Sequence, residues 1–220
     1  MSLDVDELLD YDRLRATEVA TVFVRTTTAT FVVLGSAQAT ESLDLAALGG
    51  VAVRRRRGGG GVVLLSRGDL WVDWWVPAGD PRWLPDVHAS AVAVGERWAR
   101  VLEAHRVEPV RVHRGRLVDD SSRPGVCFAG RGPGEVFVGG LKAVGVTQWR
   151  VREGVFVSTV LPASPQARLA PALARVPGAF ASLEHATVGA LGLDGVAETV
   201  LEELTRVDGP WRVERPVEPA

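Results

Sequence analysis

Two groups of residues in this sequence have the types and spacing that chemistry requires. The first is Lys142, the only lysine, since the other 24 of the 25 Lys and Arg residues are arginines. The chain also has no Asn and no Ile, which indicates a GC-rich gene that keeps residues with AT-rich codons only where they are needed. An arginine cannot replace a compact ammonium with three donors at a tight site. Two interpretations stay open here: a functional lysine, or one that survives by chance on a solvated surface.

The second group is the run RRRRGGGG at residues 54–61, between two apolar segments. Glycines let the backbone approach a ligand closely and direct successive N–H groups toward an anion. Guanidinium groups add bidentate recognition of phosphate. We favour an anion site over a solvated surface turn, because four glycines are costly to order for no purpose. The run is not a Walker A loop, since no Gly-Lys-Ser/Thr follows it.

A predicted β-hairpin positions Lys142. The pair Gly139-Gly140 favours a two-residue type I′ turn, in which both residues need positive φ. Pairing Val138 with Leu141 across this turn then sets the register of both strands. Period-2 alternation places six residues on one face, namely Glu135, Phe137, Lys142, Val144, Val146 and Gln148.

A carboxylate and an ammonium meet on this otherwise apolar face. Glu135, opposite Val144 in this register, is a diagonal neighbour of Lys142, at roughly 7–8 Å between backbones. The pair suggests a ligand cleft, although a surface ion pair of little energetic value would have the same spacing. Gly145 removes a side chain in mid-strand, where another group can approach.

The elements around these residues alternate between strand and helix patterns. The threonine-rich segment 21–33 predicts two strands around a turn, and segment 51–55 predicts another strand. Further patterns predict hairpins at 62–76 and 110–118 and a three-stranded meander at 135–161. Helices are predicted at 43–48 and 90–105, and a helical region from 162 onward ends in a helix at 195–206. We expect an α+β fold, with a mixed, largely antiparallel sheet flanked by helices.

Length and composition predict a single domain at 1–206, large enough for a catalytic domain, and a loosely attached C-terminal arm at 207–220. A net charge of −2 gives no global attraction to nucleic acid or anionic lipid, so we expect neither partner. The single cysteine, Cys127, excludes an intramolecular disulfide framework and a Cys-based zinc cluster. No stretch of about 18 apolar residues occurs, and we expect a cytoplasmic protein.

Three motifs in order resemble the lipoate–protein ligase A family, across residues 28–161. They are 55–61 (RRRGGGG) with Gly68-Asp69 after it, 140–148 (GLKAVGVTQ), and the early segment 30–38 (TFVVLGSAQ). The family belongs with biotin–protein ligases and octanoyltransferases. Its fold is similar to that of class II aminoacyl-tRNA synthetase catalytic domains, and the resemblance implies that fold here.

The resemblance also implies an activity: ATP-dependent activation of lipoate or a related medium-chain acid, such as octanoate, to acyl-AMP. The acyl group would then pass to a lysine of a lipoyl carrier domain. By the same resemblance, Lys142 is the catalytic residue, and Glu135 orients the nucleotide or a Mg²⁺ ion. The remaining substrate-binding and nucleotide-binding residues that it implies are Arg55, Arg56, Gly59, Gly60, Gly61, Gly145 and Gln148.

The sequence departs from the family pattern at several places. Gly58 replaces the usual serine, Glu135 stands where many members have Asn-Asp, and segment 154–161 lacks a His-Gly-Thr motif. We also expect no accessory C-terminal domain. Two alternatives follow: an acyltransferase that uses Cys127 as nucleophile, or a non-catalytic ligand-binding member of the fold. A buried, inert Cys127 is the more usual fate of a free cysteine.

Overall fold

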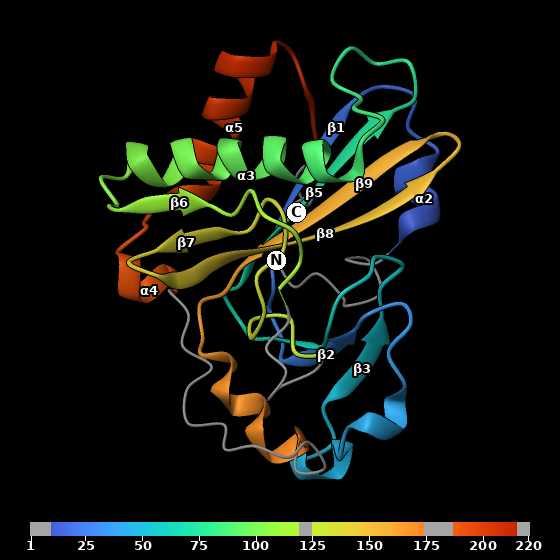
Figure 1. Cartoon of the computed structure of the whole chain (residues 1–220), viewed down its shortest axis with the longest axis vertical. Coiled ribbons are helices and arrows are strands. Elements are labelled where there is room, and N and C mark those ends of the chain that lie inside the picture. Colours follow the sequence, from blue (N-terminus) through green and yellow to red (C-terminus); the bar gives the residue numbers. More distant parts are fainter. Residues whose placement is uncertain (1–9, 119–124, 174–186, 215–220) are drawn as a thin grey trace, which may run out of the picture.

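The computed structural model describes residues 10–118, 125–173 and 187–214. Two sheets form the framework, a large one covered by helices and a small one beside it (Figure 1). The strands are β1 (Thr21–Thr26), β2 (Phe31–Leu34), β3 (Ala52–Arg55), β4 (Val63–Leu65), β5 (Leu70–Pro77), β6 (Val110–Val112), β7 (Val136–Val138), β8 (Leu141–Val151), β9 (Gly154–Leu161) and β10 (Arg212–Glu214). The helices are α2 (Tyr11–Arg15), α3 (Val87–Ala104), α4 (Val188–Leu191) and α5 (Val196–Asp208), with 3-10 helices η1 (Thr40–Ser42), η2 (Leu45–Leu48) and η3 (Gln166–Leu173).

The large sheet has seven strands in the order β10-β1-β5-β9-β8-β7-β6. All its pairings are antiparallel except that of β1 with β10. The small sheet has the order β3-β2-β4, with one parallel and one antiparallel pair. The predicted α+β class, with a mixed and largely antiparallel sheet flanked by helices, is therefore confirmed.

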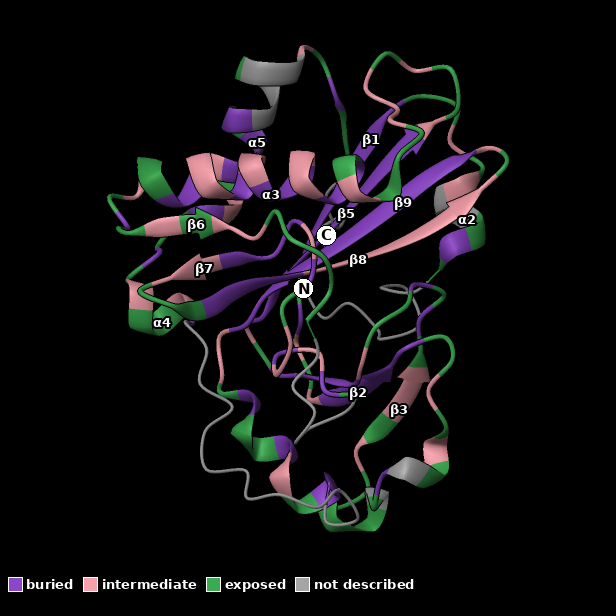
Figure 2. Cartoon of the chain, viewed as in Figure 1, coloured by how far each residue is buried: buried purple, intermediate pink, exposed green. Residues whose placement is uncertain are grey.

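The main core lies between the large sheet and helices α3 and α5. α3 begins after Asp86, whose carboxylate accepts a hydrogen bond from the N–H of Ala89, as expected for an N-cap. Val94, Trp98 and Leu102 of this helix are buried against the sheet, and the helix predicted at 90–105 is confirmed. The central strands β5 and β9 are buried along nearly their whole length (Figure 2). Such strands lack alternation because both faces are covered.

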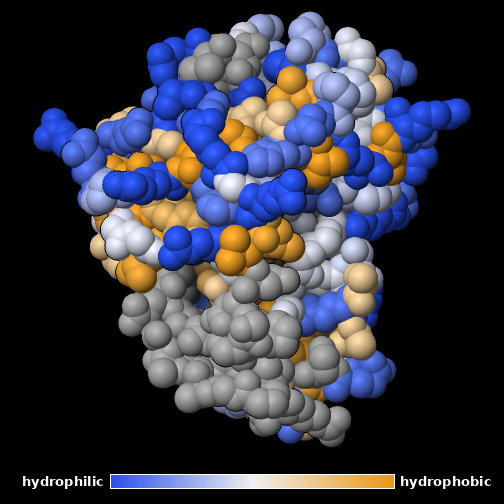
Figure 3. Space-filling model, viewed as in Figure 1, coloured by the Kyte–Doolittle hydropathy of each residue, from blue (hydrophilic) through white to orange (hydrophobic). Residues whose placement is uncertain are grey.

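A second apolar cluster fills the space between the two sheets. It joins Phe31 and Val63 of the small sheet to Trp71 and Val160 of the large one, with Phe128 from the connecting segment. The surface over α3 mixes hydrophilic and hydrophobic residues (Figure 3). No helix in the described ranges is long and apolar enough to span a bilayer.

Two predicted hairpins do not form. β4 and β5 are separate strands and not a hairpin, because the chain crosses from the small sheet to the large one between them. The two strands predicted within 21–33 are β1 and β2, and they also lie in different sheets. Segment 110–118 forms only β6, and Val118 instead bridges to Arg131. The helix expected at 43–48 is the 3-10 helix η2, and residues 174–186 of the helical region expected from 162 onward lie outside the described residues.

The C-terminal arm predicted at 207–220 carries a strand. β10 pairs in parallel with β1 and extends the large sheet at its edge. Trp211, just before β10, is 9% exposed and packs edge-on against Trp74 at 6.0 Å between ring centroids. Within the described part of the arm, these contacts fasten it to the sheet, in contrast to the loose attachment that its prolines suggest.

Candidate functional site

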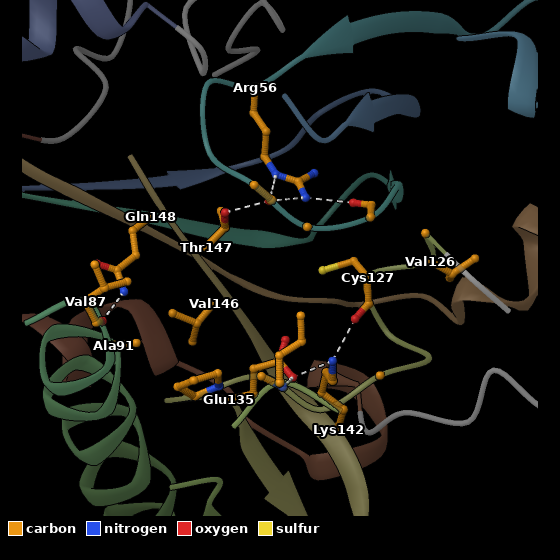
Figure 4. Close-up of a pocket in the computed structure, with 18 of the residues that line it drawn as sticks. Arg56, Val87, Ala91, Val126, Cys127, Glu135, Lys142, Val146, Thr147 and Gln148 are labelled. Carbon is orange, nitrogen blue, oxygen red and sulfur yellow. Dashed lines mark hydrogen bonds and ion pairs between the residues drawn. The ribbon is translucent and has the colours of Figure 1, made fainter. Parts of the chain in front are cut away.

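A cavity of about 560 Å³ lies where the loop after β3, the segment before β7 and strand β8 meet. Its lining includes Arg56, Gly59–Gly61, Glu135 and Lys142 (Figure 4). Residues from the arginine–glycine loop and from the predicted hairpin, far apart in sequence, thus converge on one space. The volume is in the range of ordinary ligand sites, about 300–1,000 Å³.

Lys142 lies in the wall of this cavity and is only 2% exposed. Its ammonium is 2.6 Å from Glu135 Oε2 and donates to the backbone carbonyl of Cys127 at 2.7 Å. It also lies 5.4 Å from the centre of the Phe128 ring. The surface interpretation of this lysine is therefore wrong, because the side chain is buried and held from three sides.

The glycine turn and its register explain how Lys142 reaches Glu135. Gly139 and Gly140 have φ of 58° and 90°, as a type I′ turn requires, and Phe137 pairs with Lys142 as predicted. The predicted pairing of Glu135 with Val144 is wrong, since Val136 pairs with Val144. A register shift between Val136 and Phe137 causes this, and such bulges change the direction of nearby side chains.

Glu135 is the only carboxylate in the described lining of the cavity, and it is 4% exposed. Its Oε2 accepts a hydrogen bond from the N–H of Gly132 at 2.6 Å in addition to the Lys142 contact. Burial raises the pKa of the Glu135 carboxyl, and the adjacent ammonium offsets part of that effect. Glu135 Oε2 is thus already paired with the Lys142 ammonium and the Gly132 N–H group.

Arg56 is buried at 2% exposure and organises the glycine loop. Its Nη2 donates to the carbonyls of Gly59 at 2.8 Å and Gly61 at 2.7 Å, and its Nε donates to Gly59 at 3.1 Å. Burial lowers the pKa of the Arg56 guanidinium. Thr147 of β8 also donates to the Gly59 carbonyl at 2.8 Å. A Cβ at Gly59 would meet nothing within 4 Å, so the backbone there is open to the cavity.

Arg55, Gly145 and Gln148 lie differently from Arg56. Arg55 is exposed outside the cavity, where its guanidinium donates to the carbonyls of Gly35 and Gln38. Gly145 lines a smaller inner pocket and leaves room for the ring of the chain's own Phe128, 3.3 Å from where a Cβ would stand. Gln148 lines the main cavity, but its Nε2 donates to the Val87 carbonyl on α3.

Other contributors were not predicted from the sequence. Thr147 lies at an unassigned position of the second motif, and a hydroxyl in mid-strand was the only signal for it. The carbonyl of Cys127 gives no sequence signal, because any residue could supply it. Arg150 also lines the cavity, so among the described lining residues three cations face one carboxylate. This surplus of two positive charges suits an anionic ligand.

No family model matches this sequence, and a search of curated proteins finds no relative. Solved structures do match it. Protein Ta0514 of T. acidophilum with bound lipoic acid has a TM-score of 0.68 and 15% identity, over 96% of this chain and 83% of that chain. Lipoate-protein ligase A bound with ATP has a TM-score of 0.69 and 16% identity, over 90% and 77% of the two chains.

A third match is a bi-partite lipoate protein ligase from Thermoplasma acidophilum, from a study that includes its E2 lipoyl domain. Its TM-score is 0.67 at 12% identity, over 96% of this chain and 81% of that chain. Agreement over nearly the whole chain at such low identity is a similarity of fold. The chain therefore has the fold of the lipoate–protein ligases, which is the fold that its sequence motifs predict.

Proposed function

We propose that this protein is a lipoate–protein ligase-like enzyme. It activates lipoate or a related medium-chain acid with ATP, and transfers the acyl group to a lysine of a carrier domain. The convergence of Arg56, the glycine loop and Lys142 on one cation-rich cavity, within this fold, supports the proposal. Similar structures that hold lipoic acid or ATP, and one studied with an E2 lipoyl domain, support the choice of substrates. A need for ATP also fits the cytoplasmic location that the sequence predicts.

The reaction has two balanced steps. A carboxylate oxygen of the acid attacks the α-phosphorus of ATP, and the bond to pyrophosphate breaks. A carrier lysine amine then attacks the acyl carbonyl carbon, AMP leaves with the bonding electrons, and the new amide nitrogen releases one proton to water. Negative charge grows on phosphoryl oxygens in the first step and on the carbonyl oxygen in the second. A fixed ammonium stabilises both, and we assign this role to Lys142.

The other residues position the nucleotide and the loops around it. The open backbone at Gly59, with Gly60 and Gly61, borders the space for phosphate, and Arg56 keeps that loop in shape while adding positive potential. Arg55 acts from outside the cavity by holding the 35–40 segment. Gln148 acts through α3, and Gly145 through the placement of Phe128.

The donors in this cavity do not suit a directly bound Mg²⁺ ion. Mg²⁺ takes carboxylate oxygens and keeps several waters. Glu135 is the one carboxylate in the described lining, and its Oε2 already binds an ammonium and an N–H group. Among residues 10–118, 125–173 and 187–214, no three His, Cys, Asp or Glu side chains cluster as metal ligands. We therefore assign Glu135 the role of positioning the Lys142 ammonium.

A second candidate function is acyl transfer through a thioester on Cys127, without ATP. The observation in its favour is position, because the Cys127 thiol points into the cavity between Arg56 and Lys142 (Figure 4). Burial, however, raises the pKa of this thiol, which lowers the fraction of reactive thiolate. The ligase therefore has the better support. Cys127→Ser separates the two, since it abolishes a thioester route and leaves ATP-dependent activation intact.

Pyrophosphate release tests the proposed function. Purified full-length protein is incubated with ATP and lipoate, octanoate or biotin, and pyrophosphate is measured with and without the acid. Release that depends on lipoate or octanoate, with biotin inactive, supports the proposal. Tight binding of acyl-AMP with no release under any acid would identify a non-catalytic ligand-binding protein instead.

A further inference from the structure

Arg57 ends the arginine run at 54–57, and the described lining of the cavity does not include it. Its guanidinium lies over two aromatic rings instead, 4.7 Å from the centre of the Trp149 ring and 5.6 Å from that of Tyr11. The same guanidinium donates to the two carboxylate oxygens of Asp12 at 3.0 and 2.9 Å. Tyr11 and Asp12 belong to α2, so this short helix holds the start of the glycine loop from outside the cavity.

Helix α2 is itself fixed to the large sheet, near the ends of β8 and β9 (Figure 1). Tyr11 is 4% exposed and packs in an apolar cluster with Phe23, Trp75 and Phe156. Phe23 alternates along β1 with residues of the main core, which places this cluster on the face opposite α3 and α5. Just after the helix, the carbonyl of Thr17 accepts a hydrogen bond from Trp75 Nε1 at 2.6 Å. Arg57 therefore rests on a support that the sheet holds in place.

Strand β8 connects the Arg57 contacts with the glycine loop. Thr147 and Trp149 are two residues apart on this strand and face the same side of it. Thr147 donates to the Gly59 carbonyl, while Trp149 lies under Arg57. A Cβ at Gly58 would stand 2.6 Å from the Thr147 hydroxyl, so the loop lies directly on the strand. Movement of Arg57 away from Trp149 would therefore shift the glycine backbone that borders the cavity.

The aromatic contacts matter more than the ion pair in this arrangement. The side chains of Arg57 and Asp12 are 40% and 71% exposed, and exposed ion pairs contribute little. The Tyr11 ring is buried and meets the Trp149 ring edge-on, at 5.5 Å between centroids. A guanidinium is attracted to the faces of such rings, and more strongly where water is excluded. Tyr11 thus determines where Arg57 can lie, and Asp12 orients its planar fork.

We propose that Tyr11 is a positioning residue for the nucleotide, which acts through Arg57 on the glycine loop. The loop is competent to receive phosphate groups while Arg57 stays over Tyr11 and Trp149. A loop freed from α2 spends part of its time out of position, and the apparent affinity for ATP falls by that fraction. The inference rests on the proposed function, since it assigns the phosphate groups of ATP to the backbone at Gly59–Gly61.

The test compares nucleotide and acid binding in variants of the full-length chain. Calorimetry measures the affinities for α,β-methylene-ATP, which resists cleavage at the α-phosphate, and for lipoate. Tyr11→Leu and Arg57→Gln should each weaken nucleotide binding about three- to tenfold, through the lost contact of a cation with an aromatic ring. Lipoate binding should stay within about twofold of wild type. The two losses should not multiply in the double variant, because both changes remove the same contact.

Hydrogen exchange of the ligand-free chain gives a second measurement, which does not depend on the proposed function. The amides of residues 58–61 should exchange faster in Tyr11→Leu than in wild type, because the loop loses its outer support. Exchange at the wild-type rate in this variant would overturn the inference.

Two control variants separate positioning from stability, and thermal unfolding confirms that every variant is folded at the temperature of measurement. Arg15→Gln removes an ion pair of 2.9 Å from α2 to Glu153, and Val200→Ala removes buried methyl groups from α5 in the main core. Both should keep the wild-type nucleotide affinity. Unchanged nucleotide affinity in Tyr11→Leu, an equal loss in Val200→Ala, or losses that multiply in the double variant would overturn the inference alone. Failure of wild type to bind α,β-methylene-ATP would overturn the proposed function and this inference together.

Discussion

Lys142 combines burial with three fixed contacts. Its ammonium meets Glu135, the Cys127 carbonyl and the Phe128 ring inside a cavity wall. A buried ion pair adds little net stability, because the cost of removing both charges from water offsets their attraction. What it does provide is a fixed position for the ammonium. A charge that needs no rearrangement during the reaction is the form of catalysis that this site can supply.

Lys142→Arg should therefore severely lower the rate of acyl-adenylate formation. The positive charge survives, but the planar guanidinium is wider than an ammonium and cannot meet Glu135, the Cys127 carbonyl and a reacting phosphate from one point. Losing one preorganised donor typically costs about 2.7–4 kcal/mol of barrier, or roughly a hundred- to thousandfold in rate. Single-turnover formation of acyl-adenylate measures it.

The reverse exchange provides the control for this prediction. Arg131→Lys changes an exposed cation that lies 5.3 Å over the Phe137 ring on the neighbouring hairpin strand. It should leave the rate within about twofold of wild type, in line with the small energies of exposed charged contacts. Equal acyl-adenylate formation by Lys142→Arg and wild type would show that the ammonium has no special role.

At the same scale, the sequence predicts which residues meet but not how each is used. The glycine turn gives the pairing of Phe137 with Lys142, and hence the approach of Glu135. The hairpin pattern does not contain the register shift between Val136 and Phe137. Arg55 and Arg56 are adjacent and identical in sequence. Only the fold decides that one is exposed and the other buried.

At the scale of elements, the loop after β3 is shaped by its own arginine. Glycine content suggests a loop that is mobile until an anion binds. The structure instead shows Arg56 donating to the carbonyls of Gly59 and Gly61, and Thr147 of β8 donating to Gly59. These bonds connect the loop to the large sheet and restrain its glycine backbone.

Arg56→Lys tests this arrangement through stability. A lysine ammonium cannot reproduce the fork that serves two carbonyls, so at least one part-buried acceptor loses its partner, at about 1–3 kcal/mol each. We expect a loss of about 2–4 kcal/mol, which lowers the Tm by roughly 5–15 °C for a chain of this size. Arg55→Lys is the control, since Arg55 is exposed and should change stability by about 1 kcal/mol or less. Equal melting temperatures for both variants would contradict the structural role of Arg56.

The strands themselves are easier to predict than their partners. β1, β2, β4 and β5 all lie in the segments that β-branched residues indicate. Neighbours in sequence nevertheless belong to different sheets, and the two sheets share an apolar cluster that includes Trp71 and Phe31. Strands buried on both faces show no alternation that would identify their sheet.

At the scale of the whole molecule, the cavity depends on how the two sheets are joined. Asp69 lies at one of these junctions, in the turn between β4 of the small sheet and β5 of the large one. Its carboxylate accepts hydrogen bonds from the N–H groups of Ser66 at 2.8 Å and Ala163 at 2.6 Å, and the residue is fully buried.

The buried carboxyl at this junction gives the stability of the whole chain a defined pH dependence. Burial raises the pKa of Asp69 to about 6, although the N–H groups of Ser66 and Ala163 partly oppose it. The unfolded chain releases this proton near pH 4, where an ordinary aspartate titrates. Between about pH 4 and pH 6 the folded state thus holds more protons than the unfolded state, and the contribution of Asp69 to the free energy of unfolding falls as the pH rises. The full loss is about 3 kcal/mol, from a shift of roughly two pKa units.

Asp69→Asn removes the titration but also an acceptor, so the variant is less stable at acidic pH. The difference in free energy of unfolding between wild type and variant then narrows toward pH 7. Urea unfolding of both proteins at pH 4.5, 5.5 and 7 measures that gap, and a difference independent of pH would show that Asp69 titrates alike in both states.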